Sequence, residues 1–337
     1  MTTDEPNAPD TTEATSKPEA HGQEPPADRN LVTTLGQYFF NTAPLLLVLT
    51  MSFWAANGLL GKWVALTDDL PPVGLAFWRW TLAMVLIFPF ARPHLKRDWP
   101  AVKAGWCGVL ILSVFGIGAF NTLIYWSQYS TSAVNLFLLN AALPLLIPAL
   151  SFILFRDRVG ALQAVGIGLA LMGAVTIIST GDPAVLWRLH INPGDALVLL
   201  AMISYAIYSV CLRLKPAVHP MTLLLVTFFV GTLFLLPLYV WEHLYVGPIN
   251  LTPKSLVAIG YVAIFPSFLA YLFFNRGVEL IGANRASLYF HLMPLIGTVL
   301  ALLLFQEPVD WYHGVGAVLI ITGLVLGTGR LAKKHNG

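Results

Sequence analysis

The feature that most constrains this chain is a series of long apolar runs that follows a polar N-terminal stretch. A helix needs about 20 apolar residues to cross roughly 30 Å of hydrocarbon, and ten segments approach that length, joined by short connections. Because unpaired backbone groups are not tolerated in lipid, such runs predict helices rather than an open sheet. The ten predicted spans cover residues 43–66, 73–91, 105–127, 132–154, 161–179, 195–213, 220–240, 255–275, 285–306 and 311–330.

The composition agrees with a lipid environment. Hydrophobic residues make up 57% of the chain and charged residues 11%, whereas soluble domains carry about 25% charged residues. We therefore predict an all-α integral membrane protein with ten transmembrane helices. The formal net charge of +2 gives no reason to expect a nucleic-acid partner. The two cysteines, Cys107 and Cys211, lie in apolar runs, which argues against a disulfide framework.

The positions of lysine and arginine predict the orientation of the chain. With the N-terminus in the cytoplasm, the inward connections hold ten of these residues and the outward connections hold three. This asymmetry follows the positive-inside rule and places both termini in the cytoplasm. Residues 1–40 are predicted to form a disordered cytoplasmic tail, since residues 1–30 are rich in Pro, Glu, Thr and Asp. Residues 331–337 are predicted to form a second cytoplasmic tail.

The sequence also repeats at an offset of 150 residues. Pro144 then corresponds to Pro294, and Asp157 corresponds to Glu307. The two predicted repeats cover residues 43–180 and 194–330, with five spans each. An odd number of spans inverts the second repeat relative to the first, and inverted repeats are typical of secondary transporters, which bind substrate near the midplane. The alternative is a duplication that was kept only for packing.

The predicted membrane part, residues 43–330, contains several short motifs in a fixed order and spacing. They are Trp54-Ala55-Ala56-Asn57, Phe77-Trp78-Arg79-Trp80, Pro144, Phe155-Arg156-Asp157, Gly194-Asp195, Pro266-Ser267-Phe268-Leu269-Ala270-Tyr271, Gly282-Ala283-Asn284-Arg285, Pro294 and Glu307. In their order and spacing these motifs resemble the drug/metabolite transporter superfamily, EamA type. The resemblance implies a ten-helix bundle that moves small metabolites, frequently outward, across the bacterial cell inner membrane, with amino acids and related compounds as the leading class. Two departures from the family pattern, Arg156-Asp157-Arg158 and Gln306, lie at span ends.

Arg79 is the only basic residue well inside a predicted span. It lies six residues after the start of the second span, or about 9 Å deep at a rise of 1.5 Å per residue. Two interpretations remain open at this depth. Arg79 either reaches the outer headgroups or pairs with carbonyls for packing, or it receives a carboxylate or phosphate of a substrate, for which its planar guanidinium is suited.

Polar residues recur on one helical face of the third and eighth spans. Asn121 and Tyr125 are four residues apart, and the offset of 150 places Tyr271 and Asn275 at the corresponding positions. We expect these four side chains to line a midplane substrate cavity, although single polar residues in membrane helices more often join neighbouring helices. The weaker candidates are Trp54 with Asn57, their counterparts Tyr205 and Tyr208, and Asn135 and Asn140.

Three further features of the spans each allow two interpretations. His291 is either a hydrogen-bonded packing residue or a group that titrates near neutral pH. Pro144 and Pro294 mark either packing kinks or paired bends in elements that move. Gly323 and Gly327 form a small-residue face that suits a close helix contact or a homodimer.

The sequence lacks the residues that several transport and catalytic mechanisms require. None of the 17 carboxylates lies in the middle of a span, so a central Asp or Glu proton relay is not predicted. The sequence has no Walker A loop, paired-cysteine metal motif or Gly-x-Ser-x-Gly elbow. We therefore expect no ATP drive, metal, cofactor or enzymatic activity, and we predict alternating-access transport of a small metabolite through the lipid bilayer. The alternatives are uptake or exchange, or a non-transport membrane protein such as a sensor or an intramembrane enzyme.

Overall fold

The computed structural model describes residues 31–65, 70–127, 129–131, 133–188, 190, 192–305 and 310–329. In these residues all regular secondary structure is helical, as predicted. Seven helical segments of the described chain are long and apolar enough to cross a membrane, and two shorter apolar helices accompany them. Residues 31–40, which we expected in the disordered tail, instead form helix α1 (Leu31–Phe40). The expected tails at residues 1–30 and 331–337 lie outside the described residues.

The elements of the first half and of the second half follow the same order. In both halves two continuous helices come first, and the third span contains a π-helical turn. The first half consists of α2 (Ala43–Ala65), α3 (Pro72–Ala104), α4 (Trp106–Ser113), π-turn η1 (Val114–Ala119), α5 (Phe120–Ser127), α6 (Ala133–Asn140), α7 (Leu143–Phe155) and α8 (Ala161–Ile178). After the short α9 (Ala184–Trp187), the second half consists of α10 (Pro193–Cys211), 3₁₀ turn η2 (Leu212–Leu214), α11 (Pro220–Tyr245), α12 (Pro253–Val262), π-turn η3 (Ala263–Leu269), α13 (Ala270–Ile281), α14 (Ala283–Ala286), 3₁₀ turn η4 (Ser287–His291), α15 (Leu292–Phe305) and α16 (Trp311–Gly327).

Local sequence explains where several of these helices begin. Asn192 caps α10, and its side chain and that of Asp195 form a reciprocal capping box. Thr252 and Ser255 cap α12 in the same way. A proline occupies the first turn of α3, α10, α11 and α12, where its missing N–H costs no helical hydrogen bond.

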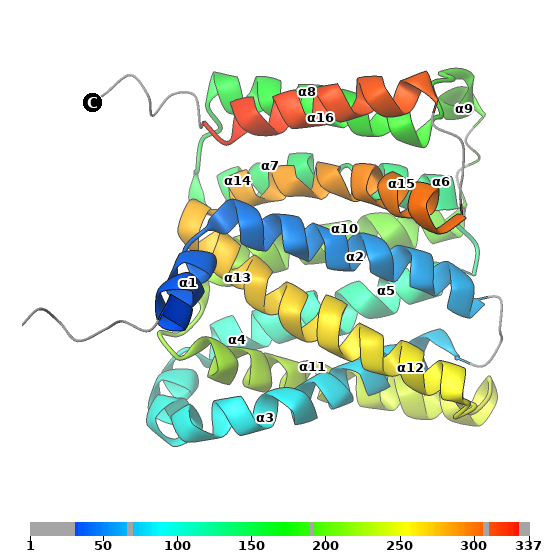
Figure 1. The fold of residues 1–337 in the computed structure, drawn as a ribbon. Helices are drawn as coiled ribbons and strands as arrows, with labels where there is room; N and C mark the ends of the chain where they lie inside the picture. The colour runs from blue at the N-terminus through cyan, green and yellow to red at the C-terminus, as the bar shows by residue number, and fades with distance from the viewer. Residues whose placement is uncertain are drawn as a thin grey trace, which may run out of the picture. The chain divides into compact units, whose positions relative to one another are not determined.

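Helices from the two halves pack in pairs. Helix α3 lies along α11, and α8 lies along α16, so each of these helices contacts its own counterpart. Helix α2 packs on α13 and α15, while its counterpart α10 packs on α5 and α7. Figure 1 shows α8 with α16 at one edge of the bundle and α3 with α11 at the other. Exchanging the halves leaves this packing pattern unchanged.

Glycines bring α8 and α16 into direct backbone contact. A Cβ placed on Gly166 would lie 2.5 Å from the backbone nitrogen of Gly327 and 2.6 Å from the carbonyl oxygen of Gly323. A Cβ on Gly173 would lie 2.6 Å from the carbonyl oxygen of Gly316. Of the two roles considered for Gly323 and Gly327, the structure thus shows a close helix contact within the chain.

The two repeat-related prolines lie at the start of helices rather than within them. Pro144 is the second residue of α7, which follows a break after α6. Pro294 is the third residue of α15, which follows the 3₁₀ turn η4. The fourth span of the first half and its counterpart are therefore both interrupted just before the proline.

Candidate functional site

Arg79 lies in the interior of the bundle, where it joins the two halves. Its side chain is 3% exposed. Its Nε donates a hydrogen bond of 2.8 Å to Oγ of Ser267, and its Nη1 donates one of 2.8 Å to the hydroxyl of Tyr125. The guanidinium carbon also lies 4.9 Å from the ring centre of Trp80, close enough for a cation–π contact. Arg79 therefore points inward, which excludes a role at the outer headgroups.

The described groups that contact the guanidinium of Arg79 are neutral. Among the described residues, the ion pairs are Arg97–Asp98, Arg213–Asp157, Lys215–Glu279 and Arg276–Glu279, and none of them includes Arg79. Burying a charge without a counter-ion is costly, and hydroxyl groups and an aromatic face are the partners that the described residues provide for this cation.

Side chains of each half bond to the π-turn carbonyls of the other half. Ser204 donates to the carbonyl oxygen of Phe115 at 2.8 Å, and Tyr271 donates to that of Gly116 at 2.7 Å. In the opposite direction, Nε1 of Trp54 donates to the carbonyl oxygen of Pro266 at 3.0 Å. A π-turn loosens the regular helical hydrogen bonding, and carbonyls inside a membrane need another donor. Both π-turns thus accept hydrogen bonds from side chains of the opposite half.

The four residues predicted to line the substrate cavity form hydrogen bonds with different partners. Asn121 donates 2.9 Å to the carbonyl oxygen of Ile117 in its own helix, and Asn275 accepts a bond of 2.6 Å from the hydroxyl of Tyr208. Tyr125 bonds to Arg79, and Tyr271 bonds to the first π-turn. Arg79, Tyr125 and Tyr271 therefore belong to the contact between halves, whereas Asn121 bonds to its own helix backbone.

An aromatic cluster borders this polar contact. The ring of Trp54 is stacked on Phe290 at 5.7 Å and meets Tyr205 edge-on at 5.6 Å. Tyr205 is 1% exposed, and its hydroxyl has no hydrogen-bond partner among the described residues. His291 follows Phe290 and is fully buried. Asn57 lies on α2, three residues after Trp54, and is half-buried.

Asn135 forms hydrogen bonds at the ends of helices and is not part of this aromatic cluster. It donates 2.8 Å to Oδ2 of Asp195, the residue that completes the capping box of α10. The hydroxyl of Thr131 donates to the other oxygen of Asp195. These contacts join the start of α6 and the residues just before it to the start of α10.

A cavity of about 770 Å³ lies at the end of the bundle that carries most of the arginines and lysines. Of the residues proposed from the sequence, only Asn275 lines it. The remaining walls come from the end of α3, the segment from Ser209 to His219, and the end of α13 with the residues after it. Sequence reasoning missed this cavity and also Ser267, although Ser267 is part of a motif and the cavity charges stand out at span ends.

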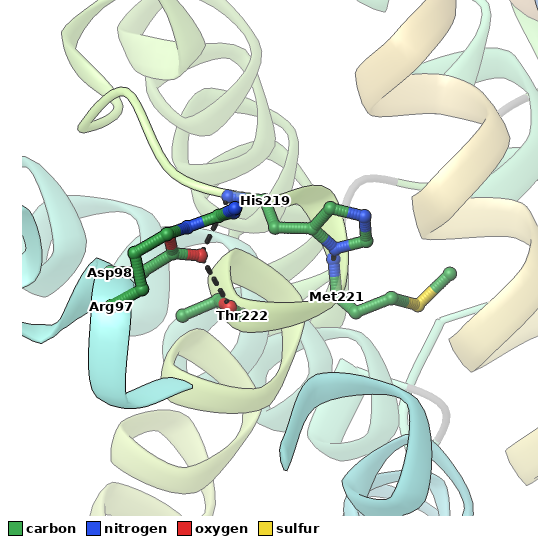
Figure 2. Close-up of polar contacts among 5 residues, drawn as sticks. All are labelled: Arg97, Asp98, His219, Met221 and Thr222. Carbon is green, nitrogen blue, oxygen red and sulfur yellow. Dashed lines mark hydrogen bonds and ion pairs between the residues drawn. The ribbon is translucent and has the colours of Figure 1, made fainter. Parts of the chain in front are cut away.

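A carboxylate of α3 binds the start of α11 beside this cavity. Oδ2 of Asp98 accepts hydrogen bonds from the backbone nitrogen of His219 at 2.9 Å and from Oγ1 of Thr222 at 2.8 Å (Figure 2). Its Oδ1 accepts one of 3.1 Å from Nε of Arg97. The imidazole of His219 is also stacked on His94 of α3, with ring centres 3.7 Å apart.

A second contact between the halves is ionic. Arg213, after α10, bonds to Oδ2 of Asp157, after α7. The hydrogen bonds from Arg213 and from Ser151 lower the pKa of the Asp157 carboxyl below its usual value. The side chain of Arg213 also lies over the ring of Phe155 at 4.2 Å. Asp157 is therefore held in its charged form.

Comparison with known proteins decides the family. The model of the EamA-like transporter family matches the chain twice, over residues 41–179 and 192–328. The chain belongs to the EamA-like transporter family. With its apolar helices of membrane length, this EamA-like protein is a multi-pass membrane protein.

Curated relatives of this EamA-like chain are named as transporters. The uncharacterized transporter YyaM of Bacillus subtilis is 28% identical over 262 residues, which cover 77% of this chain and 85% of the relative. A probable terminal-alkyne amino-acid exporter of Streptantibioticus cattleyicolor is 26% identical over 296 residues, covering 83% and 91%. A solved crystal structure with 18% identity matches with a TM-score of 0.70 over 88% of this chain and 99% of the other, which supports the fold.

Proposed function

We propose that this EamA-like protein is a secondary transporter that moves a small metabolite by alternating access. The leading substrate class is amino acids or related compounds, and the leading direction is outward across the cell inner membrane. The observation that carries the proposal is the buried contact of Arg79 with Tyr125 and Ser267, because it places between the two halves a cation that has no ion-pair partner among the described residues. The name of the Streptantibioticus relative supports an amino-acid substrate.

The proposed architecture is ten membrane helices in two inverted five-helix repeats, with both termini in the cytoplasm. The double family match and the symmetric packing of the helices support the two repeats. The ten-to-three distribution of lysine and arginine supports the orientation. A homodimer stays part of the proposal, although Gly323 and Gly327 are occupied by α8 of the same chain.

In the proposed mechanism, the two halves rock about the site between them. Arg79 binds the anionic group of the solute, and Tyr125 and Ser267 position the guanidinium. The cluster of Trp54, Tyr205 and Phe290 provides an aromatic wall for the apolar part of the solute. Since the π-turn carbonyls bond to the opposite half, these hydrogen bonds would exchange partners when the halves move. Pro144 and Pro294 would act as bends in the moving elements.

Efflux from reconstituted vesicles tests the proposal. Vesicles are loaded with a labelled metabolite panel rich in amino acids, and efflux is followed with and without a proton gradient. We expect efflux of at least one carboxylate-bearing compound, loss of that flux in Arg79→Ala, and unchanged flux in the exposed control Arg158→Ala. Absence of flux for the whole panel, or normal flux in Arg79→Ala, would contradict the transport role of this site.

A further inference from the structure

The cavity at the basic end of the bundle is separate from the Arg79 cluster. Its volume of about 770 Å³ falls within the range of small-molecule sites, about 300–1,000 Å³. Asn275 lines the cavity and accepts a hydrogen bond from Tyr208. The ring centre of Tyr208 in turn lies 5.6 Å from that of Tyr271, which bonds to the first π-turn. One residue of the cavity wall is therefore linked through Tyr208 and Tyr271 to the contact between the halves.

The charges that line the cavity are unequal. Three cations, Arg97, Arg213 and Lys215, face it together with two carboxylates, Asp98 and Glu279. Both carboxylates already have hydrogen-bond or ion-pair partners within the protein. Asp98 accepts three hydrogen bonds from protein groups (Figure 2).

Glu279 is shared by two cations. Its Oε2 lies 3.4 Å from Nζ of Lys215 and 3.1 Å from Nη1 of Arg276. An incoming cation would have to compete with these established partners, so the carboxylates do not favour a cationic ligand.

The cations, in contrast, keep hydrogen-bonding capacity. A guanidinium has five N–H donors and an ammonium has three. In the described residues, each of these side chains contacts one carboxylate: Arg97 contacts Asp98, Arg213 contacts Asp157, and Lys215 contacts Glu279. An anion with two oxygens fits this surplus of donors.

Part of the cavity wall is apolar. Val210, Leu212, Val218 and Val278 line it beside the charged groups. A ligand with an anionic group at one end and a small hydrocarbon body at the other would satisfy both surfaces. An inorganic anion would leave the apolar wall unused.

We infer that this cavity is a loading site that binds a small amphipathic carboxylate, through Lys215, Arg97 and Arg213, before the solute reaches Arg79. This inference rests on the proposed transport function. It adds a second site, away from Arg79, that binds the same small amphipathic carboxylate. Lys215 is the residue to test first, because its side chain is 25% exposed and lies in the connection between α10 and α11.

The test measures binding of labelled 3-phenylpropanoate by equilibrium dialysis. Purified full-length protein is placed in nanodiscs of phosphatidylcholine. Loss of a charged hydrogen bond weakens binding by about tenfold or more, so Lys215→Gln and Arg97→Gln should each raise the Kd by at least that factor. The matched control is Lys103→Gln, an exposed lysine that does not line the cavity. The neutral isostere 3-phenylpropanamide should bind at least about tenfold more weakly than the acid.

Three results would overturn the inference. The first is binding that Arg79→Gln abolishes and Lys215→Gln leaves intact, which would assign the probe to the central site. The second is equal binding of acid and amide. The third is loss of probe binding in nanodiscs that contain phosphatidylglycerol, which would assign the cations to lipid headgroups. Lys215-dependent binding without vesicle efflux would keep the loading site and contradict the transport proposal, so the two failures are distinguishable.

Discussion

Arg79 and Tyr125 lie 46 residues apart and are joined by a hydrogen bond of 2.8 Å that is buried within the bundle. The phenol positions the guanidinium from the first half, and Ser267 positions it from the second half. Because the cation is fixed from both sides, its orientation depends on how the halves are arranged.

Replacing Tyr125 with phenylalanine tests this arrangement. The substitution removes one acceptor from a buried charged donor, and such a loss costs about 1–3 kcal/mol. We expect a lower free energy of unfolding in Tyr125→Phe, measured by chemical denaturation of the protein in mild detergent. Tyr129→Phe is the matched control, because Tyr129 is 66% exposed. Equal stability of the two variants would show that the hydrogen bond contributes nothing.

The contact between α8 and α16 predicts a difference between two glycines of one helix. Gly166→Ala places a methyl group 2.5 Å from the backbone of Gly327, whereas Gly168→Ala meets no atom within 4 Å. Overpacking of this kind costs about 1–3 kcal/mol, while alanine at an open helical position adds helix propensity. We expect a lower Tm for Gly166→Ala and an equal or higher Tm for Gly168→Ala. A normal Tm in both variants would contradict the backbone contact.

The stacked imidazoles of His94 and His219 predict a pH dependence. Burial lowers the pKa of His219 below its usual value of 6.5, and the nearby His94 and Arg97 lower it further, while Asp98 acts in the opposite direction. The unfolded chain then binds more protons than the folded chain as the pH falls through 6.5, so stability decreases with acidification.

We therefore expect the Tm to fall between about pH 7.5 and pH 5.5, and the slope to be smaller in His219→Gln than in the wild type. His190→Gln, at an exposed position, should keep the wild-type slope. The readout is the slope of Tm against pH, because the substitution also removes the acceptor for the backbone nitrogen of Met221. A wild-type slope in His219→Gln would remove this residue from the pH response.

The ion pair between Asp157 and Arg213 predicts a salt-dependent effect. Both side chains are partly exposed, at 35% and 41%, and exposed pairs contribute at most about 1 kcal/mol. Because hydrogen bonds lower the pKa of Asp157 below 3.8, its contribution is present above that pH and is lost as the pH falls through the lowered pKa. Asp157→Asn should reduce stability slightly at neutral pH and low salt. Thermal scans in about 1 M salt should show a smaller difference, because screening shortens the range of the interaction.

The sequence was sufficient to predict an all-helical membrane protein with two matching halves, since these follow from hydrophobic run length and constant spacing, and the family model matches each half. It also singled out Arg79, because a cation inside an apolar run is conspicuous. The partner Ser267 was not predicted, since a serine in a membrane helix has no distinctive pattern and its role depends on which helices meet.

The π-turns could not be predicted for a related reason. Their existence depends on donors from the other half, such as Trp54 and Tyr271, which bond to the loosened carbonyls. The cavity was missed because it forms where the end of α3, the segment between α10 and α11 and the end of α13 come together, and hydropathy does not predict which helix ends meet. Residues 31–40 were assigned to the tail because they precede the first long run, yet they form a helix.

The two π-turns occupy equivalent places in the two matches to the family. Val114–Ala119 and Ala263–Leu269 end 150 residues apart, which is the offset that also relates Pro144 to Pro294. A π-turn departs from the regular helical hydrogen bonding, so each copy presents backbone acceptors at the same position of its third helical segment. Side chains of the opposite copy bond to these acceptors, and the contact is therefore reciprocal.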